Sequence, residues 1–161
     1  MTIQKGDKIP AVTLKKLGDG GMEDVDMAAY LKGKKAVIFA VPGAFTPTCA
    51  QKHLPGYVSQ ADEIKSKGVD EIICLSVNDP FVMKHWGEVA GADGKVTMMP
   101  DGNGALTKAM GLEMDGTGFG LGFRSKRYMM VVEDGVVQDI QIEDNPGEVE
   151  LSGAEVCAAR L

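Results

Sequence analysis

The sequence has no long apolar run, only three cysteines, and fewer basic than acidic residues. No segment approaches the roughly 20 consecutive apolar residues that a membrane-spanning helix needs, and residues 1–10 do not form the apolar part of a signal peptide. We therefore expect a cytoplasmic protein with no membrane partner. The net charge of −6 also argues against nucleic acid as a partner, because phosphate binding needs clustered Lys and Arg.

The cysteines Cys49, Cys74 and Cys157 are too few to form a disulfide framework. In a reducing compartment, each is either a reactive thiol or a buried apolar side chain. The chain also shows no internal repeat, low-complexity tract or long linker. With 161 residues, of which 44% are apolar, it fits a single domain over residues 1–161 that is stabilised by its core.

Glycines and prolines divide the chain into short segments whose apolar patterns predict strands and helices. The run 36–41 is apolar throughout, which is typical of a central strand buried on both faces, and 72–77 is similar. Asp134-Gly135 predicts an antiparallel hairpin, and the glycines of 18–21 predict another near the N-terminus. The remaining expected strands are 12–17, 98–99, 128–133 and 136–142, and the expected helices are 26–31, 47–67 with a kink at Pro55, 80–90 and 105–110.

The order of these elements predicts an α/β fold of thioredoxin-like type. A β-α-β-α segment followed by β-β-α gives a mixed central sheet with helices on both faces and an N-terminal hairpin. The final helix is predicted from a capping box, in which Ser152 precedes Glu155 by three residues. Leu151 and Cys157 would share the apolar side of this helix.

The most informative segment is 42–49, Pro-Gly-Ala-Phe-Thr-Pro-Thr-Cys, between a predicted buried strand and a predicted helix. With Thr46 as the helix cap and Pro47 as the first helical residue, Cys49 falls in the first turn. Unpaired backbone N–H groups and the positive end of the helix dipole lie there, and they favour the reactive thiolate. An arbitrary cysteine is more often a small buried apolar residue, so its neighbours decide between the two interpretations.

Those neighbours match a known motif. Pro42, Thr46 and Cys49 reproduce the Pro-x-x-x-Thr-x-x-Cys motif of peroxiredoxins at full spacing. With residues 52–56 and 76–83, the chain resembles the type II, peroxiredoxin-5-like subfamily over nearly its whole length. The resemblance implies a thioredoxin fold, in which Thr46 stands where a thioredoxin has its first active-site cysteine. It also implies thiol-dependent reduction of hydroperoxides without a cofactor, and a homodimer.

The same resemblance assigns the catalytic residues. Arg127 matches the arginine that enters the strand beside the active site, where its charge would favour the thiolate of Cys49. Thr46, Arg127 and the backbone N–H of Cys49 would hold the two peroxide oxygens as charge develops on the leaving oxygen. Pro42 would shield the sulfur from water. Cys49, Thr46, Arg127 and Pro42 are therefore the predicted catalytic residues.

A second thiol must reduce the sulfenic acid that forms on Cys49. The spacing from Cys49 to Cys74 resembles that of plant type II members, where the second cysteine is a proposed resolving partner. However, Cys74 lies on a predicted central strand, which favours a role in the core, and Cys157 is interpreted as a packing residue. We therefore expect glutathione with glutaredoxin as the reductant and thioredoxin as the alternative, while Cys74 stays a possible resolving cysteine.

Other interpretations of these residues are open. A non-enzymatic redox sensor or adaptor of thioredoxin fold would need the same motif and would form a mixed disulfide with a partner protein. Cys49 and His53, four residues apart on a helix, could also form a metal pair, but no ligand-spaced repeat accompanies them.

Two further features concern the surroundings of the motif. Phe45 and Phe81, beside the predicted active-site loops, are candidates for the homodimer surface. The glycine-rich run 116–122 lacks the spacing of a phosphate-binding loop and is interpreted as a flexible loop on the substrate side.

Overall fold

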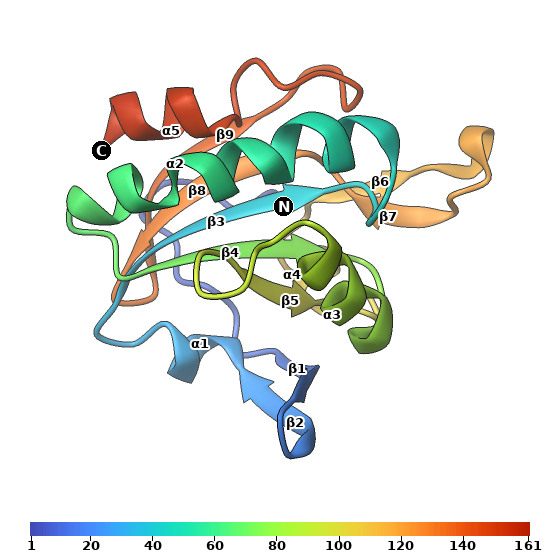
Figure 1. The fold of residues 1–161 in the computed structure, drawn as a ribbon, viewed down its shortest axis with the longest axis horizontal. Coiled ribbons are helices and arrows are strands. Elements are labelled where there is room, and N and C mark those ends of the chain that lie inside the picture. Colours follow the sequence, from blue (N-terminus) through green and yellow to red (C-terminus); the bar gives the residue numbers. More distant parts are fainter.

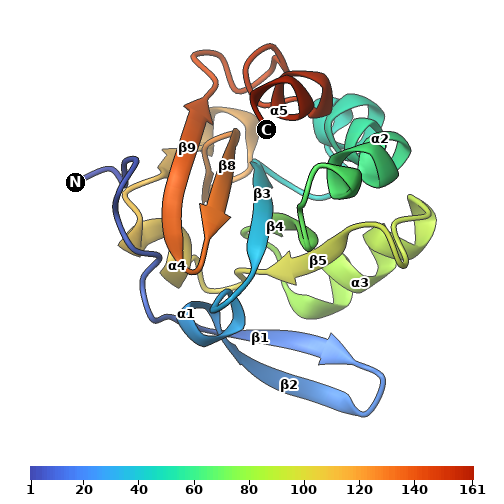
Figure 2. The same cartoon turned by 90° about the vertical axis from the view of Figure 1, so that its left-hand side faces the viewer.

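The computed structural model describes residues 1–161 and contains a five-stranded mixed sheet with helices on both faces (Figures 1 and 2). The strand order is β5-β4-β3-β8-β9, in which β3, β4 and β5 are parallel and β8 and β9 are antiparallel to their neighbours. The predicted α/β architecture is therefore confirmed. The strands are β3 (Lys35–Val41), β4 (Glu71–Ser76), β5 (Thr97–Pro100), β8 (Tyr128–Glu133) and β9 (Val136–Ile142).

Alternate residues of the central strands enter two separate cores, as expected for strands buried on both faces. On β3, Phe39 belongs to the core shared with α2, α3 and α5, whereas Ile38 belongs to the core shared with α1 and α4. Figure 2 shows the two groups of helices on opposite sides of the sheet. The helices are α1 (Met27–Tyr30), α2 (Leu54–Ser66), α3 (Pro80–Val89), α4 (Ala105–Ala109) and α5 (Ala154–Arg160).

Side chains define the starts of two predicted helices. The Asp26 carboxylate accepts hydrogen bonds from the N–H groups of Ala28 and Ala29 at the start of α1. Asp79 accepts from Val82 at 2.9 Å, with Pro80 as the first residue of α3. In both cases a carboxylate satisfies donors that the first helical turn leaves unpaired.

The predicted capping box before α5 is wrong. The N-cap of α5 is Gly153, and no side chain caps the helix. The hydroxyl of Ser152 instead donates to the carboxylate of Glu143 at 2.6 Å, because this acid is buried beside it. Leu151 precedes the helix and is 36% exposed, so it does not share the buried side of α5 with Cys157.

Two small antiparallel sheets accompany the main one. The predicted N-terminal hairpin is β1 (Thr13–Gly18) and β2 (Gly21–Asp26), which packs near α3 and β5. The glycine-rich run is enclosed by two strands that the sequence did not predict, β6 (Glu113–Asp115) and β7 (Phe123–Ser125). These three-residue strands are too short to show a clear alternating pattern.

The register of the main sheet brings four chain segments to one edge. Val41 at the end of β3 pairs with Ser76 at the end of β4, and Ala40 pairs with Tyr128 at the start of β8. Tyr128 also pairs with Ile142 at the end of β9. The segment after β3, which contains Cys49, therefore lies beside the residues that precede β8 and follow β9. No helix of the chain has both the length and the apolar character to cross a membrane.

Candidate active site

Cys49 lies in the first turns of a helical segment that follows β3, as the sequence predicts. Residues 47–48 are helical and lead into a π-helical turn, η1 (Cys49–His53), which continues into α2. The π turn ends two residues before Pro55 of α2, whose missing N–H and bulky ring disfavour a regular helical ladder there. The kink predicted at Pro55 is thus a change of helix type. Isolated π turns of this kind occur frequently at functional sites.

Hydrogen bonds on two sides fix the loop that carries Thr46. Thr46 holds the predicted N-cap position before Pro47, and its carbonyl accepts from the N–H of Ala50. Its hydroxyl donates to the carbonyl of Gly43 at 2.7 Å instead of capping the helix. On the other side, Asn78 accepts from the N–H of Ala44 at 2.9 Å and from the hydroxyl of Ser76 at 2.5 Å. Asn78, two residues after the end of β4, was not recognised from the sequence as part of this region.

Arg127 is the centre of the polar contacts around Cys49. Its side chain is buried, with the residue only 2% exposed, and it donates to three acceptors. Nη2 lies 3.0 Å from Sγ of Cys49, Nη1 lies 2.9 Å from Nδ1 of His53, and Nε lies 2.9 Å from the carbonyl of Pro146. Arg127 forms no salt bridge, so the sulfur is the only one of its acceptors that can become an anion.

His53 is a neutral acceptor in this arrangement. Its Nε2 lies 2.9 Å from the carbonyl of Ser152, which can only accept, so Nε2 carries the hydrogen and Nδ1 is free to accept from Arg127. Burial first, and the charge of Arg127 second, lower the pKa of His53 to about 3. Sequence reasoning considered His53 only as a metal ligand and missed this contact.

A buried carboxylate organises the C-terminal loop, residues 143–153. Glu143 is 8% exposed, and its Oε2 accepts from the N–H groups of Glu150, Leu151 and Ser152 and from the hydroxyl of Ser152, at 2.6 to 3.0 Å. Burial opposes ionisation, but the hydrogen bonds from Ser152 and its neighbours outweigh it and lower the pKa of Glu143. This loop supplies the carbonyl groups that hold Arg127 and His53.

The model of the redoxin family matches residues 4–156, which is nearly the whole chain. Rice peroxiredoxin-2E-2 (Oryza sativa subsp. japonica, chloroplastic) is 50% identical over 96% of this chain and 70% of its own. The chain is a peroxiredoxin of the redoxin family. Arabidopsis thaliana peroxiredoxin-2D is 44% identical over 95% of this chain and 94% of its own.

The solved structures agree with this assignment. The reduced Prx3 of Vibrio vulnificus in complex with H2O2 is 48% identical, and each chain covers 99% of the other with a TM-score of 0.94. This peroxiredoxin is therefore a thiol-dependent peroxidase with a thioredoxin-like fold, and its resemblance to the type II subfamily is confirmed.

The other two thiols of the peroxiredoxin are buried in the same core as Cys49. Cys74 is on β4, paired in register with Phe39 and Met98, and burial raises its pKa well above the ordinary value, with the nearby Cys49 a smaller cause. Burial likewise raises the pKa of Cys157, on α5, to about 11. Both thiols are therefore held in their protonated, unreactive form.

The geometry also bears on the metal-pair hypothesis. The lone pairs of Cys49 Sγ and His53 Nδ1 both face the guanidinium of Arg127. A metal ion between them would lie beside a buried positive charge, and the repulsion would oppose binding. The pair is therefore better described as two acceptors of one protein cation.

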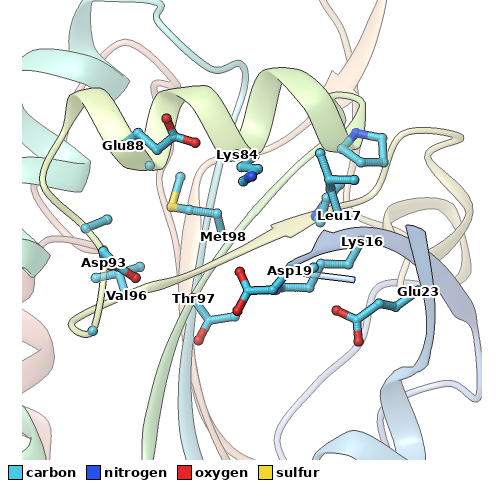
Figure 3. Close-up of a pocket in the computed structure, with 16 residues that line it drawn as sticks. Lys16, Leu17, Asp19, Glu23, Lys84, Glu88, Asp93, Val96, Thr97 and Met98 are labelled. Carbon is cyan, nitrogen blue, oxygen red and sulfur yellow. The ribbon is translucent and has the colours of Figure 1, made fainter. Parts of the chain in front are cut away.

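A hollow of about 480 Å³ lies away from Cys49, between the N-terminal hairpin, α3 and β5 (Figure 3). None of the four predicted catalytic residues lines it, and side chains of both charge signs do. Its charged residues are Lys16, Asp19, Glu23, Lys84, Glu88 and Asp93. Nothing in this hollow provides thiol chemistry.

Replacing Glu143 with glutamine should destabilise the fold at neutral pH. We expect a loss of roughly 1–3 kcal/mol in the free energy of unfolding, because the amide accepts hydrogen bonds more weakly than the charged carboxylate. Since folding lowers the pKa of Glu143, this stabilisation is complete above the unfolded glutamate pKa of about 4.3 and is lost as the pH falls through the folded value. Urea unfolding from neutral to acid pH measures the difference.

The exposed Glu148 of the same loop provides the control. Glu148→Gln should change the free energy of unfolding by less than about 0.5 kcal/mol. Equal losses in the two variants, or a Glu143→Gln deficit that persists at the acid end of the series, would contradict this role for the buried carboxylate.

Proposed function

We propose that Cys49 is the nucleophile of the peroxidase reaction. Arg127, Thr46 and Pro42 are the residues that act on its sulfur or on the bound peroxide. The observation that carries this proposal is the 3.0 Å hydrogen bond from Arg127 Nη2 to Cys49 Sγ, made by a buried cation without a carboxylate partner. In a buried environment of low dielectric constant, such a cation strongly favours negative charge on the sulfur. Pro42 is also buried and would limit access of water to it.

The proposed step is an in-line displacement. The thiolate of Cys49 attacks one peroxide oxygen, an S–O bond forms and the O–O bond breaks. The leaving oxygen takes the bonding electron pair and the proton of the attacked oxygen, and departs as water or an alcohol, which leaves Cys49 as a sulfenate. Arg127 stabilises the negative charge that develops on this oxygen. The hydrogen of the Thr46 hydroxyl already binds Gly43, so we propose that its oxygen accepts a hydrogen bond from the peroxide.

Two variants test these roles. Cys49→Ser should abolish peroxide consumption, and Arg127→Gln should lower the second-order rate constant of Cys49 oxidation by roughly 10²–10³-fold, because the stabilising charge is lost. Stopped-flow oxidation and NADPH-coupled turnover measure both effects. Arg160→Gln, on the surface of α5, is the matched control and should leave the rate unchanged.

Turnover also separates the peroxidase from the sensor hypothesis. A sensor would be oxidised once and then stall in the presence of reductant, whereas a peroxidase consumes NADPH continuously. An Arg127→Gln enzyme as fast as Arg160→Gln would overturn the proposed role of Arg127.

For the reductant, we propose glutathione with glutaredoxin, with thioredoxin as the second candidate. The burial of Cys74 and Cys157 supports an external thiol. Cys74 is a member of a central strand, so its movement to Cys49 requires local unfolding that costs several kcal/mol. A cytoplasmic location, which we also propose, would supply reduced glutathione.

Alanine variants of Cys74 and Cys157 test the recycling route. Both should retain turnover within about twofold of the wild type with glutathione and glutaredoxin, because neither thiol takes part in the proposed route. The coupled assay is run with each reductant in turn, and thermal unfolding shows whether each variant is folded. Loss of turnover in Cys74→Ala alone, in a folded protein, would assign the resolving role to Cys74 instead.

We also propose a homodimer that covers an exposed aromatic patch next to the active-site loop. Phe45 is 46% exposed and has a φ of 63°, a left-handed conformation that costs a non-glycine residue about 1 kcal/mol. Phe81 on α3 is 62% exposed, one helical turn from His85, whose ring centroid lies 6.0 Å from that of Phe45. The two phenylalanines therefore flank His85, and exposed apolar patches of this kind favour protein contacts.

Sedimentation velocity over a concentration series tests the dimer. Phe81→Glu should raise the dissociation constant of the dimer by roughly 100-fold, because a carboxylate would be buried without a partner. Met22→Glu is the matched control, since Met22 is 50% exposed on the N-terminal hairpin. The proposal is wrong if the wild type stays monomeric or if Phe81→Glu associates as well as Met22→Glu.

A further inference from the structure

We propose that His53 is a positioning residue, a neutral acceptor that aims the guanidinium of Arg127 at Cys49 while leaving its positive charge uncompensated. The inference rests on the proposed roles of Cys49 and Arg127. It adds a residue that contacts neither the sulfur nor the peroxide, and it explains why this acceptor is a histidine.

The planar guanidinium explains the positioning. Arg127 is held at Nε by the carbonyl of Pro146 and at Nη1 by Nδ1 of His53, each at 2.9 Å. Because the guanidinium is rigid and planar, two fixed nitrogens determine where the third points. Nη2 is thereby directed at Cys49 Sγ, 3.0 Å away. Without the contact to His53, only the hydrogen bond from Nε to the carbonyl of Pro146 would orient the group toward the sulfur.

His53 is itself held in one orientation and one tautomer. Its Nε2–H donates to the carbonyl of Ser152, which leaves the lone pair on Nδ1 for Arg127. The ring packs against Phe39, with centroids 4.9 Å apart, and against Tyr57, at 5.6 Å. Cys49 and His53 begin and end the π turn η1, and their acceptor atoms meet two nitrogens of the same guanidinium.

The charge of the acceptor matters as much as its place. Asp or Glu would bind Arg127 more strongly, but a carboxylate in contact would neutralise the guanidinium that the sulfur needs. A neutral imidazole binds the cation without cancelling its charge. Its other neighbours are the aromatic rings and the Ser152 carbonyl. The carboxylate of Glu143, which also acts on the charge of His53, is engaged by the C-terminal loop.

Four variants separate position from charge. His53→Asn and His53→Asp have nearly the same shape, and each places an oxygen near the position of Nδ1, but only Asp is charged. His53→Leu removes the acceptor. Tyr57→Phe is the control for the loop, because the Tyr57 hydroxyl donates to the same Ser152 carbonyl at 2.7 Å without touching Arg127.

We expect His53→Leu and His53→Asp to oxidise Cys49 at least about tenfold more slowly with hydrogen peroxide, and His53→Asn and Tyr57→Phe to stay within about threefold of the wild type. The pH profile of Cys49 alkylation by iodoacetamide provides the second readout. It should move to higher pH in the Leu and Asp variants and stay in place in the Asn variant and in Tyr57→Phe. A residue that only stabilised the fold would not sort the variants by charge.

The outcomes separate this inference from the proposed function. If Arg127→Gln is slow but His53→Leu matches the wild type in rate and pH profile, His53 has no positioning role. If Asp and Asn behave alike, the charge of the acceptor is irrelevant and that part of the inference is wrong. Circular dichroism checks that each variant folds. If His53→Leu does not fold, the comparison of His53→Asn with His53→Asp decides whether His53 has the proposed role. If His53→Asp does not fold, the comparison of His53→Leu with His53→Asn decides it. Normal rates in Arg127→Gln would overturn the proposed function itself.

Discussion

The structure around Cys49 depends on one buried positive charge that lacks a negative partner. Arg127 is 2% exposed and forms no salt bridge, which is an unfavourable state for an arginine. The cost of burying this charge is reduced when the sulfur beside it is an anion. The hydrogen bond from Arg127 to Sγ of Cys49 is therefore the contact on which the proposed function depends.

The remaining features of the site keep this charge in place without neutralising it. The antiparallel register of β3 and β8 brings Arg127 opposite the loop after β3, and β9 continues into the C-terminal loop that surrounds it. Glu143 is the nearby carboxylate, and it is held by donors of that loop rather than by Arg127. The acceptors left for the guanidinium are two neutral groups and one thiol. The negative charge of Glu143 thus stabilises the C-terminal loop without neutralising the positive charge of Arg127 beside the sulfur.

Sequence patterns predicted the sheet, most helices and the position of Cys49, because these follow from local periodicity and from residues with restricted backbone conformations. Arg127 was found only through resemblance to a family, since nothing in its neighbours distinguishes it from a surface arginine. The partners of Arg127 were missed for a physical reason. His53 is 74 residues away in the chain, and the other missed acceptor is the backbone carbonyl of Pro146, a group that every residue has. The capping box at Ser152 was predicted wrongly for the same reason. The hydroxyl of Ser152 binds the carboxylate of Glu143, nine residues away, and the local sequence pattern does not show this partner.

The three cysteines differ in their polar contacts, and this difference supports the proposed role of Cys49. All three are buried in one core and none is exposed, so accessibility does not distinguish them. Burial is the largest influence on Cys74 and Cys157, and it favours the protonated thiol, which is seen in their raised pKa values. Cys49 experiences the same burial but also accepts a hydrogen bond from a guanidinium and lies at a helix start. The hydrogen bond from Arg127 thus distinguishes Cys49 from the other two buried thiols, and under the proposed function it decides which cysteine meets the peroxide.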